Sequence, residues 1–156
     1  MSTTLVRGPL TQLLLSTLST LGKPVGDGIV PRKEAGAAWS GPPNAPGSVF
    51  TPFTVLITLS AGLSSGPFAD SQADWVVPYM LEAFGVSREQ CEWMADAARS
   101  ALHALTHQSF ELGTDRYKVQ QVKTDSIGGV NRVMVTDPPF YGQQDGLSVW
   151  ITKEIS

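Results

Sequence analysis

Residues 74–105 read DWVVPYMLEAFGVSREQCEWMADAARSALHAL, and this stretch decides the fold class. Its first part is rich in β-branched and aromatic residues with alternating polarity, which predicts a strand from Asp74 to Phe84. Ser87 then has the position of a helix N-cap, and Gln90 follows three residues later, the spacing of a capping box. A strand followed directly by a capped helix indicates an α+β unit. The helix is predicted to reach Leu105, with a buried stripe of Cys91, Met94, Ala98, Leu102 and Leu105.

The same strand contains a proline. Trp75, Val77, Tyr79 and Leu81 share one face, and Pro78 lies among them. Proline has no N–H to donate to a neighbouring strand, so we expect either an edge strand or a bulge at this point.

The first 60 residues are predicted to form a helix, then an irregular segment, then a strand. Pro9 to Leu21 predicts a helix with a leucine stripe, ended by Gly22. Residues 23–48 contain so many glycines and prolines that we expect an extended loop or arm without regular structure. Val49 to Ser60 has a period of two and predicts a strand.

Three further strands are predicted in the last third, over Arg116–Val122, Val130–Thr136 and Leu147–Lys153. Turns are expected at residues 127–129 and 137–139. The economical architecture is a single α+β domain over residues 1–156: one mixed or antiparallel sheet with two main helices packed on one face, and the long Gly/Pro-rich arm near the N-terminus.

Composition narrows the function classes. The 156 residues suffice for one domain with a sizeable core. A net charge of −3 with scattered lysines and arginines disfavours a DNA-binding surface. The single cysteine, Cys91, falls on the apolar stripe and is interpreted as a small buried hydrophobe. There is neither a secretory signal pattern nor an apolar run of about 18 residues, so we expect a soluble protein made in a cytoplasm.

The sequence carries no arrangement that predicts catalysis. His103 and His107 are four residues apart, but Ala104 stands where a zinc protease motif needs glutamate. No glycine-rich phosphate loop or nucleophile elbow is present in the sequence. We therefore expect neither an enzyme nor a cofactor or metal site.

Several local strings, in their order, carry a family resemblance. They are the helix end Leu21-Gly22, then Pro24-Val25-Gly26-Asp27-Gly28 and Pro31, the strand Thr54–Leu59, Phe84-Gly85-Val86, Ser87-Arg88-Glu89-Gln90 with Trp93, Asp96 and Arg99, and Pro138-Pro139-Phe140-Tyr141. With this order, the chain resembles the tail terminator (head–tail joining) proteins of long-tailed phages, especially those of actinobacterial hosts. Pro78 and the composition of residues 23–48 depart from the family pattern.

The resemblance implies a structural role in the virion, at the junction of tail and neck. Such proteins form a ring, here expected to be a homohexamer, on the last ring of the tail tube. The ring stops tube polymerisation and joins the tail to the head connector. The implied partners are further copies of the chain, the tail tube protein and the connector or neck protein. DNA would pass through the ring without specific binding, and no membrane is involved.

Aromatic residues are common anchors of protein interfaces, and four are interface candidates here: Trp39, Phe68, Phe140 and Tyr141. Local core packing is the alternative for each of them. Two alternative functions also remain open at this stage. One is another neck or head-completion protein, and the other is a monomeric ligand-binding α+β domain with a pocket under the long loop.

Overall fold

The computed structural model describes residues 8–29, 39–40, 49–50, 52–59, 63–64, 74–112, 115–133 and 140–154; of these, 39–40, 49–50, 63–64, 112, 132–133 and 140 are described by backbone alone. The helices are α1 (Gly8–Ser19) and α2 (Arg88–His103). The strands are β1 (Val25–Asp27), β2 (Trp39–Ser40), β3 (Val49–Phe50), β4 (Phe53–Thr58), β5 (Leu63–Ser64), β6 (Asp74–Gly85), β7 (Ser109–Leu112), β8 (Asp115–Ile127), β9 (Asn131–Val133) and β10 (Phe140–Lys153).

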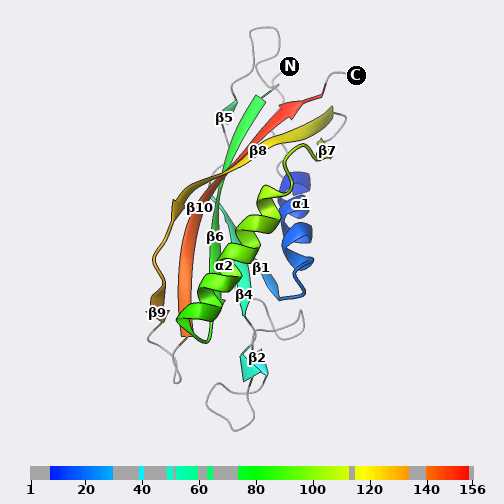
Figure 1. Ribbon diagram of the computed structural model, residues 1–156. Coiled ribbons are helices and arrows are strands. Elements are labelled where there is room, and N and C mark those ends of the chain that lie inside the picture. The colour runs from blue at the N-terminus through cyan, green and yellow to red at the C-terminus, as the bar shows by residue number, and fades with distance from the viewer. Residues whose placement is uncertain are drawn as a thin grey trace.

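One sheet organises the fold. Its strands follow the order β1-β4-β6-β10-β8-β7, with β5 paired to β6 and β9 paired to β10. β1 runs parallel to β4, whereas the other pairs in this sheet are antiparallel, so the sheet is mixed. β2 and β3 form a separate two-stranded pair. Both helices lie on one side of the main sheet (Figure 1). The predicted α+β architecture is confirmed.

The capped helix α2 begins as the sequence predicts, with one difference. The Ser87 hydroxyl accepts a hydrogen bond from the Gln90 backbone N–H at 3.2 Å. The Gln90 side-chain oxygen accepts from the N–H of Val86 at 2.7 Å, one residue before the position that the capping-box pattern predicts. The predicted apolar stripe of α2 and the turn after it is buried: Cys91, Met94, Ala98, Leu102 and Leu105.

The core lies between the helices and one face of the sheet. Leu10, Leu14 and Leu18 of α1 are at most 1% exposed and pack with the stripe of α2. Alternate residues of β6 and β10 form the sheet side of this core: Val77, Tyr79, Leu81, Leu147, Val149 and Ile151. The Tyr79 hydroxyl reaches the Thr11 hydroxyl of α1 at 3.0 Å, so the tyrosine keeps a polar partner inside the core.

Pro78 corrects one prediction. β6 is a central strand, paired with β4 on one side and with β10 in continuous register on the other, so it is neither an edge strand nor bulged there. The Pro78 carbonyl accepts a hydrogen bond from Leu59, directly after β4 ends. In a strand the N–H and C=O of one residue point to the same side, so the missing N–H faces the interval between β4 and β5. Proline therefore costs no hydrogen bond between paired strands.

Other boundaries differ from those predicted. The stretch 23–48 contains β1 and β2, although no regular structure was expected there. The strand predicted over residues 49–60 divides into β3 and β4, and β7 was not predicted. Residues 127–129 do not reverse the chain, because β8 and β9 pair with the same side of β10. They interrupt the strand segment made by β8 and β9, which together pair with β10 as the first half of a long hairpin. The expected turn at 137–139 lies outside the described residues.

Candidate interaction surface

The sheet face away from the helices is the candidate functional surface. Strand register places Val76, Pro78 and Met80 of β6 on this open face, opposite Trp150, Ser148 and Gly146 of β10, respectively. Farther along the same strands, Glu82 lies opposite Gln144, and Phe84 opposite Gly142. Apolar side chains thus concentrate on the β6 half of the open face, while β10 contributes polar residues and glycines apart from Trp150.

A second hydrophobic cluster lies on the open face, separate from the main core. Phe53 and Val55 of β4 are 2% and 3% exposed, and Ile57 and Phe84 pack against them. The rings of Phe53 and Phe84 are stacked with centroids 4.7 Å apart. A sheet whose second face also carries packed aromatic residues differs from the usual antiparallel sheet with one solvated face.

Large apolar side chains also reach solvent. Leu59 follows β4, and Trp150 stands on β10 beside Val76; they are 53% and 38% exposed. Trp93 is 52% exposed, but it projects from α2, on the other side of the molecule from the open face. Burying Trp150 or Leu59 against another protein would remove apolar surface from water, which favours association.

An ionic cluster holds the N-terminal half of β10 against α2. The Asp145 side chain is 1% exposed and accepts hydrogen bonds from Arg99 at 2.8 Å, from Gln143 at 2.9 Å and from the backbone N–H of Gly128 at 3.1 Å. Arg99 also pairs with Asp96, which is exposed. Buried charges require such partners. Asp145 therefore fixes the interruption between β8 and β9 relative to the helix.

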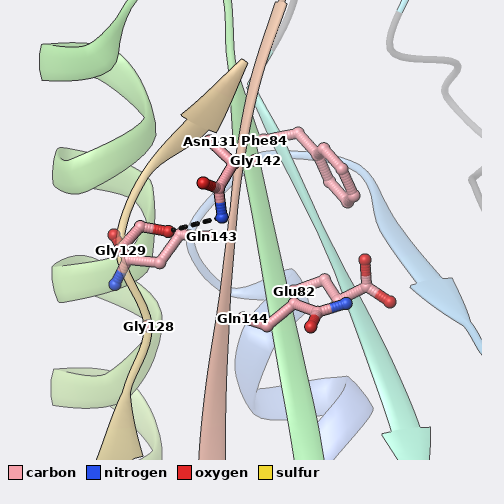
Figure 2. Close-up of a pocket in the computed structure, with 8 residues that line it drawn as sticks. All are labelled: Glu82, Phe84, Gly128, Gly129, Asn131, Gly142, Gln143 and Gln144. Atoms are coloured by element: carbon pink, nitrogen blue, oxygen red, sulfur yellow. Dashed lines mark hydrogen bonds between the residues drawn. The ribbon is translucent and has the colours of Figure 1, made fainter. Parts of the chain in front are cut away.

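That interruption opens a hollow of about 350 Å³ on the sheet. It is lined by Glu82, Phe84, Gly128, Gly129, Asn131, Gly142, Gln143 and Gln144. Figure 2 shows the Phe84, Glu82 and Gln144 side chains extending from β6 and β10 in the same direction, while the Asn131 amide turns back to donate to the Gly129 carbonyl. Among the described residues that line the hollow, Glu82 is the only one with a formal charge.

A close backbone contact shapes the hollow. A Cβ atom added to Gly128 would lie 2.2 Å from the Gln144 carbonyl oxygen, whereas one added to Gly129 would meet nothing within 4 Å. Only glycine fits at position 128, because the obstructing atom belongs to the backbone and cannot rotate away.

The predicted interface residues are only partly described. Trp39 belongs to β2 and pairs with Phe50, and Phe140 begins β10 opposite Val133, in both cases through described backbone. Tyr141 is half-buried and pairs with Gly85, next to the Gly142 that lines the hollow. Phe68 lies outside the described residues.

Sequence reasoning missed Trp150, Phe53 and Phe84 as surface candidates, although a signal existed for Trp150. It alternates with Leu147, Val149 and Ile151, so the pattern already placed it opposite the core. Phe53 and Phe84 had no such signal, because their contact depends on the pairing of β4 with β6.

The structure describes the surroundings of Cys91, His103 and His107, the side chains that the sequence analysis considered for chemistry. Cys91 is buried and its thiol donates to the Ala83 carbonyl. Burial, with smaller contributions from Glu92 and Asp145, raises the pKa of the Cys91 thiol from 9.0 to about 11, so the nucleophilic thiolate is scarce at neutral pH. His103 ends α2 and its ring contacts the Thr124 hydroxyl at 2.8 Å, while His107 has a positive φ of 76° in the following turn.

The described residues contain neither a metal-ligand cluster nor a helix that could span a membrane. No group of three or more His, Cys, Asp or Glu side chains there could hold a metal ion. No helix among them has the length and hydropathy needed to cross a membrane.

Comparisons with known proteins do not assign a family. No protein-family model matches the chain, and no curated protein matches it. One solved structure, whose name describes no function, has a TM-score of 0.48 and 12% sequence identity, covering 100% of this chain and 98% of its own.

Proposed function

We propose that this protein is a structural virion protein that forms a ring on the end of a phage tail tube, stops tube polymerisation and joins the tail to the head connector. The proposal rests on the resemblance carried by the ordered strings from Leu21 to Tyr141. It assigns the protein no catalytic activity, no cofactor and no contact with a membrane. Its location is the tail–neck junction of the virion, after assembly in the host cytoplasm.

The structural observation that best supports this proposal is the open face of the sheet. The helices cover one face, and on the other face Leu59 and Trp150 are exposed beside the Phe53–Phe84 cluster, which is packed within the chain. A closed ring needs a patch that binds a different patch on the next copy. Exposed Leu59 and Trp150 provide one such patch. The expected copy number is six.

Charge is compatible with passage of DNA through the ring. A net charge of −3 gives phosphates no general attraction to the protein. The tail tube protein and the head connector or neck protein are the proposed partners on the two sides of the ring.

The test is the solution mass of the purified protein over a concentration series, alone and with tail tubes. We expect either a discrete hexamer or a monomer that becomes six copies at a tube end, where electron microscopy should show tubes that no longer lengthen. A monomer that ignores tubes at every concentration would refute the proposal.

Two exposed tryptophans make a matched pair of variants for this test. Trp150→Gln alters the open face, and Trp93→Gln alters a more exposed position on α2. If the open face forms the ring contact, Trp150→Gln should lower the oligomer mass and Trp93→Gln should leave it unchanged. The reverse pattern would transfer the interface to α2.

The ligand-binding alternative has one observation in its favour, namely the hollow beside Glu82. Its volume lies at the lower end of the roughly 300–1,000 Å³ typical of small-molecule sites. A monomer at all concentrations that binds a small molecule in this hollow would establish that alternative.

A further inference from the structure

We infer that the hollow at the interruption between β8 and β9 is a binding site for an arginine side chain presented by a different protein. This inference goes beyond the proposed ring, because binding of one side chain in this hollow does not depend on the number of copies assembled.

The negative charge of the hollow determines that its ligand is positively charged. Glu82 lies on its wall, half-buried, and among the described residues no cation pairs with its carboxylate. The other nearby carboxylate, Asp145, is already neutralised by Arg99 on the helix side of β10. A carboxylate at the wall of a partly closed hollow favours a cationic group over an anion or a neutral polar group.

The shape of the hollow favours a guanidinium group over a compact ammonium. Gln144 lies directly opposite Glu82 in register, and rotation of its side-chain amide can present the amide oxygen as a second acceptor beside the carboxylate. Phe84 provides an apolar wall next to these acceptors, against which the aliphatic part of an arginine side chain can lie. The planar guanidinium group of arginine has five N–H donors. Two of them can bind a carboxylate in bidentate fashion while the others remain available for a further acceptor, whereas the lysine ammonium acts as a point charge.

Glycine makes the hollow accessible to such a side chain. Gly128, Gly129 and Gly142 line the hollow, and a Cβ atom added to Gly129 would meet nothing within 4 Å, so the backbone there is open to a ligand. Glycine inside a strand often marks a site at which a ligand approaches the backbone closely. The hydrogen bond from Gly128 N–H to Asp145 holds this wall in place without a ligand.

For the three of the six arginines whose side chains the structure describes, pairing within the chain favours a different protein as the source of the arginine. Each arginine whose side chain the structure describes has an acidic partner in the chain: Arg88 with Glu92, Arg99 with Asp96 and Asp145, and Arg116 with Glu154. A second copy would have to break such a pair to supply one of these side chains.

The test uses N-acetyl-arginine amide as the probe and the full protein labelled with ¹⁵N, observed by TROSY NMR. We expect saturable shifts of the amide signals of Gly128, Gly129 and Gly142. The neutral isostere N-acetyl-citrulline amide should produce no such shifts, and N-acetyl-lysine amide should bind more weakly than the arginine derivative. Added salt should weaken the arginine interaction, since the site is only partly buried.

Glu82→Gln is the decisive variant, because it removes the charge and keeps the shape of the side chain. It should weaken binding of the arginine derivative by about fivefold to tenfold, the loss expected for one charge-assisted contact at a half-exposed site. Glu111→Gln on β7 removes an exposed carboxylate outside the hollow and should leave binding unchanged. Equal shifts with citrulline, or equal binding by the Glu82→Gln variant, would overturn the inference.

The source of the arginine is tested by the mass of the Glu82→Gln variant. An unchanged oligomer mass with lost arginine binding supports a different protein as the partner. A lower oligomer mass would assign the arginine to a second copy and overturn that part of the inference. A protein that remains monomeric at every concentration, even with tail tubes, but binds the arginine derivative would refute the ring and leave the arginine site standing.

Discussion

Replacing Asp145 by asparagine should destabilise this protein far more than the same change at Asp96, although both carboxylates contact Arg99. Asp145 is 1% exposed on its side chain, and Arg99 is 14% exposed. The substitution keeps an acceptor for the N–H of Gly128 but leaves the arginine charge with an exposed partner only.

The magnitude follows from burial. Removing one partner of a buried, hydrogen-bonded charge pair costs about 3–5 kcal/mol, and retention of one acceptor oxygen brings our expectation for Asp145→Asn to about 2–4 kcal/mol. Asp96 has a side chain that is 68% exposed, so Asp96→Asn should cost less than about 1 kcal/mol.

Urea unfolding measures both variants, with the denaturant slope checked for constancy. Arg99→Met completes a double-mutant cycle with Asp145→Asn, and the double variant should lose less stability than the sum of the single variants. Equal midpoints for Asp145→Asn and Asp96→Asn, or strict additivity in the cycle, would refute the claim that this pair secures β10 to α2.

Three further predictions concern backbone fit, capping and pH. Gly128→Ala should cost about 1–3 kcal/mol through its clash with a fixed backbone oxygen, whereas Gly129→Ala should be nearly neutral; equal urea midpoints would contradict the close contact. Ser87→Ala should cost about 1 kcal/mol through loss of the N-cap hydrogen bond, and an unchanged midpoint would show that the cap contributes nothing. The Cys91 thiol has a folded pKa raised from 9.0 to about 11, so the unfolded chain releases its proton first; the stability contributed by this thiol should be complete below pH 9 and lost as the pH rises through 11. In Cys91→Ala the decline of unfolding free energy over this window should be shallower than in the parent protein, and identical slopes would contradict the raised pKa.

Local patterns were sufficient to predict the helices and the core side of β6. The spacing of Leu10, Leu14 and Leu18 and of the α2 stripe follows the helical period, and each of these residues is buried. The N-cap at Ser87 was also predictable, because it depends on residues only three apart.

The N-terminal half of β10 was not predictable as a strand from its own residues. Residues 142–146 comprise two glycines, two glutamines and an aspartate, a composition with low β-strand propensity. The segment is a strand because β6 pairs along its whole length, with β8 and β9 on the other side. Asp145 is buried there only because Arg99, 46 residues away, reaches it.

The hollow was unpredictable for the same reason. The short interruption at Gly128 and Gly129 reads as a turn, and its true form depends on the register of β9 against β10. β1 was missed because three residues in a Gly/Pro-rich stretch gain their strand geometry from β4.

The place of β10 in the sheet has a consequence for synthesis. A ribosome makes β6 and β8 before β10, yet β10 lies between them and pairs with both. Until β10 leaves the exit tunnel, the nascent chain lacks the centre of its sheet, and the edges of β6 and β8 that β10 will pair with have no partner. Such edges favour aggregation. The sheet is therefore completed only after every partner strand of β10 has been made, and the open face takes its final form at that step.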